Sequence, residues 1–274
     1  MLAGTLSYPF ALLGNRPATV IFCLLFGVAV DTAVYYAFST AGLFAPGPTA
    51  NGVARALRDL AYFGICSALT APASALILVR ALIGLGMREP ERGITFGDCL
   101  RFLWVSLLAY GFVTGPAFVL KELGRTALVP HLGSAAAAAF TASFLIAFVP
   151  QALFLFRFAF AWPHTLAIQS PVFFRAWALT RDRFWTMAGV LTPVLIMQTL
   201  IIYGGSVLAA QLAYRLPPSL PMYAEANHPG VGWLIYVVLF QVARVLGSFY
   251  LAAANVYLYA RLTPRPVMLA RVFT

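Results

Sequence analysis

Charge is scarce in this sequence. Its 274 residues include 18 Lys or Arg and 8 Asp or Glu, while 62% of the residues are hydrophobic. The mean hydropathy is +0.87. A soluble domain of this size would have far too little polar surface with such a composition. The sequence therefore excludes a soluble domain and predicts an integral membrane protein.

Residues that could bind a metal or carry out catalysis are also few. The three cysteines, Cys23, Cys66 and Cys99, have no metal-type spacing and lie in or at the ends of apolar runs. The three histidines fall in different connections or span ends. The chain contains no His-Glu-x-x-His, Gly-x-Ser-x-Gly or Walker motif. We therefore expect no catalytic residues, no metal site and no cofactor.

The N-terminus lacks both a basic region ahead of its apolar stretch and a small-residue cleavage site, so we predict no removable signal peptide. A transmembrane helix needs about 20 mostly apolar residues. By that criterion residues 1–274 form one all-α, polytopic membrane domain with interfacial helices and six transmembrane helices. The six spans are placed near residues 18–39, 60–84, 99–120, 137–161, 184–209 and 232–260.

The basic residues lie mainly in alternate connections between these spans. Six spans put both termini on one side, and the segments on that side carry eleven Lys or Arg: Arg16, Arg80, Arg88, Arg92, Arg101, Arg175, Arg181, Arg183, Arg261, Arg265 and Arg271. The opposite connections carry five: Arg55, Arg58, Lys121, Arg125 and Arg215. The positive-inside rule then predicts a cytoplasmic N-terminus and C-terminus. Anionic lipid headgroups are the natural partner of such residues, so the net charge of +10 does not require nucleic acid.

An ungapped shift of 167 residues aligns the first span and the segment before it with the fifth span. Eight residues are identical across residues 8–39, and the matched Thr, Tyr and Ser are hard to attribute to hydrophobic bias. Because both copies enter from the same side, the sequence predicts parallel repeats related by an axis along the membrane normal. With a fainter copy beginning near Phe96, the possible repeat units are residues 8–90, 94–168 and 173–263.

Aromatic and basic residues alternate just before the fifth span, at Arg175, Trp177, Arg181, Arg183 and Trp185. Trp side chains suit the acyl boundary of a bilayer, while Arg side chains reach the phosphates. The segment is therefore predicted to lie in the lipid headgroup layer. An orientation anchor explains every residue in it, so this interpretation is preferred to a specific lipid site.

A short motif in the same segment also resembles a known group: Ala176-Trp177-x-Leu179-Thr180-Arg181-x-Arg183-Phe184-Trp185. Heading a hydrophobic hairpin in a six-span chain, it looks like the membrane domain attached to some bacterial glycerophosphodiester phosphodiesterases, and like its free-standing six-span relatives. The resemblance implies a location in the bacterial cytoplasmic (inner) membrane and an auxiliary role. The chain lacks the soluble barrel domain that carries phosphodiester hydrolysis in such enzymes, so the resemblance does not imply that reaction.

Ionisable groups inside a bilayer are costly and are by default functional hypotheses. Asp31 lies about 22 Å along its helix from the preceding basic residue, and Arg244 lies about 25 Å from the same side, at 1.5 Å per residue. Their depths permit pairing. Gln198 occupies the place of Asp31 in the repeat, and Gln241 shares a polar helix stripe with Arg244. We therefore expect Asp31, Gln198, Gln241 and Arg244 to converge near the middle of the bundle.

Two interpretations of this cluster remain open. One is a structural ion pair with a hydrogen-bond network, which is preferred because such groups must be paired wherever they occur. The other is a polar binding site or translocation path. The sequence accordingly predicts a non-enzymatic accessory or scaffold protein for envelope or lipid-related machinery, with a membrane-protein partner. The alternative function is a small-solute or lipid transporter.

Overall fold

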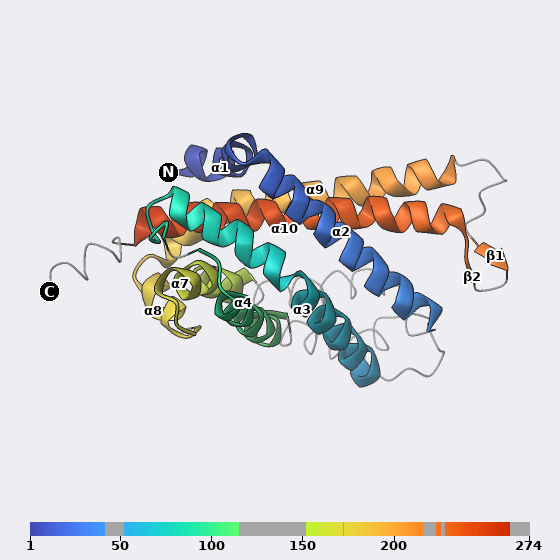
Figure 1. Cartoon of the computed structure of the whole chain (residues 1–274), viewed down its shortest axis with the longest axis horizontal. Helices are drawn as coiled ribbons and strands as arrows, with labels where there is room; N and C mark the ends of the chain where they lie inside the picture. Colours follow the sequence, from blue (N-terminus) through green and yellow to red (C-terminus); the bar gives the residue numbers. More distant parts are fainter. Residues whose placement is uncertain are drawn as a thin grey trace, which may run out of the picture.

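Long helices run lengthwise through the molecule and make up most of its mass (Figure 1). The structure is a computed structural model that describes residues 1–41, 52–91, 93–114, 152–171, 173–215, 223–225 and 228–263. Its strands in this part of the chain are β1 (Tyr223–Glu225) and β2 (His228–Pro229), a short antiparallel pair before the last helix. The predicted helical fold class is confirmed, with this small hairpin as an addition.

Four helices in the described part of the chain are long and apolar enough to cross a membrane. They are α2 (Pro17–Thr40), the Gly64–Gly84 part of α3 (Gly52–Gly84), α9 (Phe184–Tyr214) and α10 (Val231–Leu262). They match the first, second, fifth and sixth predicted spans, although α9 and α10 extend beyond the predicted ends. The described part of the chain thus has four candidate membrane spans, as expected of a helical membrane protein.

The third and fourth predicted spans are only partly described. α4 covers Phe96–Ala109 and continues as a π-helical turn, η1, over Tyr110–Thr114. The rest of the third span and most of the fourth lie outside the described residues. From Ala152 a helical stretch leads through a turn at residues 159–160 into α7 (Ala161–Ile168). Six spans therefore stay a prediction.

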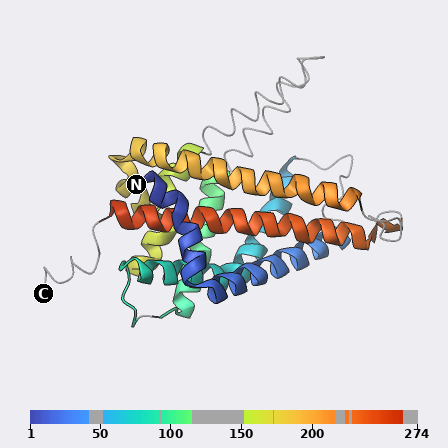
Figure 2. The same cartoon turned by 90° about the horizontal axis from the view of Figure 1, so that it is seen from above.

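The short helices gather at one end of the bundle (Figures 1 and 2). α1 (Leu2–Asn15), α7 and α8 (Arg175–Arg181) lie at this end, which is also where α10 ends. The N-terminal helix and the C-terminal end of α10 therefore share one side of the molecule. We call this side the basic end, because the arginines of α8 and of the connection between α3 and α4 belong to it.

The two segments of the predicted repeat each begin at a break between helices. α1 ends at Asn15 and α2 begins at Pro17, while α8 ends at Arg181 and α9 begins at Phe184. The starts of α2 and α9 are thus separated by the same 167 residues as the aligned sequences. In both segments an arginine with non-helical backbone angles, Arg16 or Arg183, precedes the long helix.

α9 and α10 form the most closely packed helix pair. A Cβ atom added at Gly205 would lie 2.2 Å from the Cβ atom of Ala243, and one added at Gly247 would lie 2.6 Å from Cγ1 of Ile202. Small residues at such positions let helix backbones approach each other closely in a membrane. In α3, the small residues Ser67, Ala71 and Ala75 at four-residue spacing are all buried as well.

We expect Gly205→Ala to lower the free energy of unfolding by about 1–3 kcal/mol, because the new methyl group forces the α9 and α10 backbones apart. Unfolding by SDS titration, followed by circular dichroism, measures this. Gly204→Ala is the matched control, since a Cβ atom at Gly204 has nothing within 4 Å. Equal unfolding midpoints for the two variants would show that α9 and α10 can separate without a loss of stability.

Candidate functional site

A cavity of about 370 Å³ lies among α2, α3, α4, α7, α9 and α10. Most of its wall is apolar and includes Leu24, Ile77 and Phe249. Along α10 it extends from Arg244 to Asn255, eleven residues or about 16 Å at 1.5 Å per residue. Cavities of about 300–1,000 Å³ are the usual size of small-molecule sites.

An ion pair stands at the end of the cavity farther from the basic end. Nη2 of Arg244 donates a hydrogen bond to Oδ2 of Asp31, joining α10 to α2. The guanidinium carbon lies 5.5 Å from the ring centroid of Tyr62, which adds a cation–π contact from α3. The Asp31 side chain is 9% exposed and that of Arg244 is 30% exposed. The expected proximity of these two charges is confirmed.

The two predicted glutamines take different places. Gln198, on α9, lines the same cavity as Asp31 and Arg244. Gln241 is fully buried beside the cavity rather than in its wall, and its Nε2 donates to Oη of Tyr62 at 3.4 Å. Three of the four predicted cluster residues therefore line the cavity, and the fourth, Gln241, is hydrogen-bonded to Tyr62 beside it.

Several polar residues of the wall were not singled out from the sequence. Ser67, Thr70 and Ser74 line the cavity from one face of α3. Their three- and four-residue spacing places them on one helix face, and this spacing could have identified them from the sequence. Thr70 donates its hydroxyl to the carbonyl oxygen of Cys66 at 2.7 Å, a bond within its own helix. Cys23 and Cys66 also line the cavity, whereas Cys99 does not.

Asn255 marks the other end of the cavity. Its side chain belongs to the polar stripe of α10 but is only 4% exposed. Its Oδ1 has no hydrogen-bond partner within the described part of the chain. A buried polar atom normally has a partner, and leaving it without one costs about 1–3 kcal/mol. Less than 1 Å² of this Oδ1 atom is accessible, so it is closed off from the open volume of the cavity.

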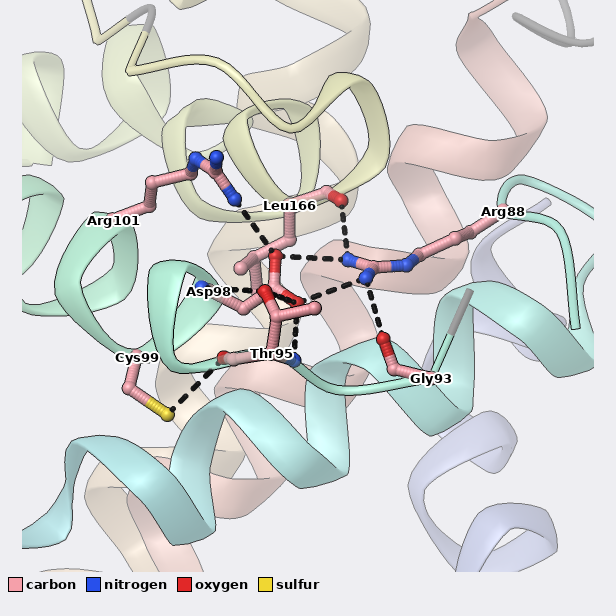
Figure 3. Close-up of polar contacts among 7 residues, drawn as sticks. All are labelled: Arg88, Gly93, Thr95, Asp98, Cys99, Arg101 and Leu166. Atoms are coloured by element: carbon pink, nitrogen blue, oxygen red, sulfur yellow. Dashed lines mark hydrogen bonds and ion pairs between the residues drawn. The ribbon is translucent and has the colours of Figure 1, made fainter. Parts of the chain in front are cut away.

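A second buried polar cluster lies outside the cavity, at the basic end (Figure 3). Arg88, just after α3, donates from Nη1 to Oδ1 of Asp98 at 3.1 Å and from Nη2 to Oδ2 at 2.8 Å. It also donates to the carbonyl oxygens of Gly93 and of Leu166, in the last turn of α7, both at 2.9 Å. The side chains of Arg88 and Asp98 are 2% and 0% exposed. We call this group the Arg88–Asp98 cluster.

Asp98 is the third residue of α4 and forms a capping box with Thr95, the residue just before the helix. Its backbone N–H donates to Oγ1 of Thr95 at 3.3 Å, while the Thr95 backbone N–H donates to Oδ2 of Asp98 at 2.9 Å. Burial favours a raised pKa for Asp98, but the hydrogen bonds from Arg88 and Thr95 outweigh it and lower the pKa. This cluster was not predicted from the sequence, although Thr95-x-x-Asp98 before an apolar run is a recognisable capping signal.

The Arg88–Asp98 cluster positions part of the cavity wall. It joins the start of α4 to the end of α7, and these helices carry Ser106 and Trp162. Nε1 of Trp162 donates to Oγ of Ser106 at 3.0 Å, and both residues line the cavity. Because every charge in the cluster already has partners, its chemistry indicates a structural role.

The predicted interfacial segment is fixed by Arg157. Its guanidinium carbon lies 5.1 Å from the ring centroid of Trp177 and 4.6 Å from that of Phe184. Its Nη1 donates to the carbonyl oxygens of Thr180 and Arg181 at 3.3 Å. Arg157, assigned from sequence to the fourth span, thus holds the end of α8.

Other members of the segment face outward. Trp185 is 84% exposed, and Arg175, Arg181 and Arg183 are exposed too. Burial lowers the pKa of His164, and the nearby charge of Arg175 lowers it further. The Nδ1 atom of His164 lies 3.0 Å from Oη of Tyr259. These exposed aromatic and basic side chains have the character expected of a headgroup-facing surface.

Among the described residues, no group of three or more His, Cys, Asp or Glu side chains is placed to hold a metal ion. Comparison of the chain with protein-family models, with curated proteins and with solved structures finds no match in any of the three.

Proposed function

We propose that this is a non-enzymatic, six-span protein of the bacterial cytoplasmic membrane that binds a small solute or lipid in the cavity between Arg244 and Asn255, as a transporter or carrier does. The observation that carries the proposal is the cavity itself, which lies among membrane-crossing helices and combines apolar walls with polar groups at both ends. Such a combination is typical of small-molecule sites.

This cavity favours the alternative function predicted from the sequence, a polar intramembrane site, over a scaffold. Protein interiors are usually close-packed, whereas Asp31 and Arg244 border open volume. The apolar surfaces of α2 and α9 are those of any helix facing lipid, and so they do not single out a protein partner.

The proposed topology places both termini in the cytoplasm, with the basic end at the cytoplasmic leaflet. It is supported by the distribution of arginines between the connections. The proposed parallel repeat of residues 8–90, 94–168 and 173–263 is supported by the matching starts of α2 and α9. The proposed relationship to the membrane domain of glycerophosphodiester phosphodiesterases rests on the motif at residues 176–185.

The test is to purify the protein in patches of its own membrane and to identify retained molecules by mass spectrometry. We expect a retained molecule in the wild type that falls at least tenfold in Ala252→Phe, because the new ring fills the cavity. Ala37→Phe is the matched control, since Ala37 is exposed on α2 outside the cavity. A stable protein complex without any retained molecule would support the accessory or scaffold function instead.

A further inference from the structure

We infer that the cavity accepts an uncharged long-chain carbonyl compound, such as an acyl ester, whose carbonyl oxygen accepts a hydrogen bond from Arg244. This inference rests on the proposed function and names the class of molecule that the cavity binds. Three features of the cavity carry it: the unused donors of Arg244, the neutralisation of Arg244 by Asp31, and the apolar walls that lead from this pair toward Asn255.

Arg244 has more hydrogen-bond donors than its contacts use. A guanidinium group carries N–H donors on Nε, Nη1 and Nη2 and has no acceptor. In the described part of the chain Nη2 donates to Asp31, whereas Nε and Nη1 have no hydrogen-bond partner. These two atoms keep accessible surface, and the side chain, 30% exposed, lines the cavity. An oxygen atom of a ligand can therefore reach donors that no described residue occupies.

The charge of the site favours an acceptor without net charge. Asp31 is buried and already neutralises Arg244. A ligand carboxylate or phosphate would leave a net negative charge among membrane-crossing helices, and a ligand ammonium would meet the cation of Arg244. A carbonyl oxygen avoids both costs, and its hydrogen bond to a charged donor is stronger than one between two neutral groups.

The hydroxyl groups near Arg244 are compatible with the same ligand. Ser248 lines the cavity four residues after Arg244 on α10, about 6 Å along the helix. Its exposed hydroxyl has no hydrogen-bond partner in the described structure, so it can donate to the same carbonyl group. Hydroxyl groups both donate and accept, whereas a guanidinium group only donates. Arg244 is therefore the residue that selects an acceptor.

The rest of the cavity matches an alkyl chain that points toward the basic end. Beyond Ser248 the wall is mainly apolar, with Phe249, Leu251 and Ile77 among its residues. The Oδ1 atom of Asn255 is closed off at the far end, and the indole N–H of Trp162 already donates to Ser106. An alkyl chain gains from leaving water and needs no polar partner there.

The test compares how much of each probe the protein retains. The full chain is reconstituted in nanodiscs of dialkyl ether phosphatidylcholine, because this lipid contains no acyl ester that could compete. The probes are deuterated methyl decanoate, dodecane, decanoate and decylamine at equal bilayer concentrations. Retention in the cavity is the excess over the Ala252→Phe variant, whose new ring fills part of the cavity.

We expect methyl decanoate to be retained at least fivefold more than dodecane, decanoate or decylamine. Infrared spectra of the ester, labelled with carbon-13 at its carbonyl, give a second readout that needs no change near the ion pair. The carbonyl band should move to lower wavenumber in the wild type than in Ala252→Phe, because a hydrogen bond from the guanidinium group weakens the carbonyl bond.

The double variant Asp31→Leu with Arg244→Leu removes the donors without leaving an unpaired charge. It should abolish both the preference for the ester and the shift of its carbonyl band. Arg80→Leu is the matched control and should keep both, because Arg80 is exposed on α3 and does not line the cavity. If the double variant fails to fold, the infrared shift in the wild type still tests the hydrogen bond.

The outcomes separate the inference from the proposed function. Equal retention of ester and dodecane, stronger retention of decanoate or decylamine, or an unshifted carbonyl band overturns the carbonyl class but leaves a binding cavity. An ester preference that survives in the double variant overturns the role of Arg244. If Ala252→Phe retains every probe as well as the wild type does and no native molecule co-purifies, the proposed function itself fails.

Discussion

Asp98→Asn is expected to lower the free energy of unfolding by about 3–5 kcal/mol, the range for breaking a buried ion pair by removing one partner. The Asp98 carboxylate accepts hydrogen bonds from Arg88, Arg101 and both donors of Thr95. An asparagine amide replaces one acceptor oxygen with a donor that faces these donors. Arg88 is then left charged at 2% side-chain exposure without its counterion. SDS unfolding, monitored by circular dichroism, measures the change.

The control for this prediction is Asp182→Asn, which removes an exposed carboxylate at the end of α8 and should change stability by less than about 0.5 kcal/mol. The apolar double variant Arg88→Met with Asp98→Leu should recover only part of the loss, because the carbonyl oxygens of Gly93 and Leu166 lose their donor. A loss below about 1 kcal/mol in Asp98→Asn would mean that water compensates Arg88, contrary to its burial.

The ion pair of Arg88 and Asp98 should also make the stability of the protein depend on pH in the acidic range. The pKa of Asp98 is lowered in the folded protein from its ordinary value of 3.8, so its charge stabilises the fold above that pH. This contribution should decline as the pH falls below 3.8 and through the folded pKa. The stability difference between wild type and Asp98→Asn should therefore narrow in that acidic range and be constant near neutral pH.

The second large effect is expected from Asp31→Leu, which leaves Arg244 without its counterion among membrane-crossing helices. We expect a loss of about 3–5 kcal/mol, since both the broken pair and the unpaired cation in the bilayer are costly. The double variant Asp31→Leu with Arg244→Leu should be closer to wild type than either single variant. A double-mutant cycle by SDS unfolding gives the coupling energy.

Thr32→Val is the control for this second prediction. Thr32 follows Asp31 in α2, and its buried hydroxyl has no partner in the described structure, so its removal should be neutral or mildly stabilising. If Asp31→Leu proved as mild as Thr32→Val, the Asp31 carboxylate would not be the counterion that Arg244 requires.

Helical periodicity and bilayer dimensions predicted much of what the structure contains. Spans one, two, five and six follow from runs of apolar residues, because a helix that crosses lipid must be apolar around most of its surface. The meeting of Asp31 and Arg244 followed from their depths. A charge inside a bilayer needs a partner, and only these two acidic and basic groups lay at a similar level in predicted spans.

Other features depend on contacts between segments far apart in sequence. The roles of Arg88, which reaches Leu166, and of Arg157, which reaches α8, require the tertiary arrangement. Gln241 shared a stripe with Arg244, yet it lies behind Tyr62, because the direction of a side chain depends on which neighbouring helix it meets. The missing partner of the buried Asn255 Oδ1 is likewise visible only in the tertiary structure.

The close packing of α9 against α10 has a mechanical consequence for the cavity. Where Gly205 meets Ala243 and Gly247 meets Ile202, the two backbones leave no room for either helix to rotate or slide inward. The α9–α10 pair is therefore expected to move as one rigid body. We therefore expect that, if the cavity changes volume, α2, α3, α4 and α7 on its other side move more than α9 and α10 do.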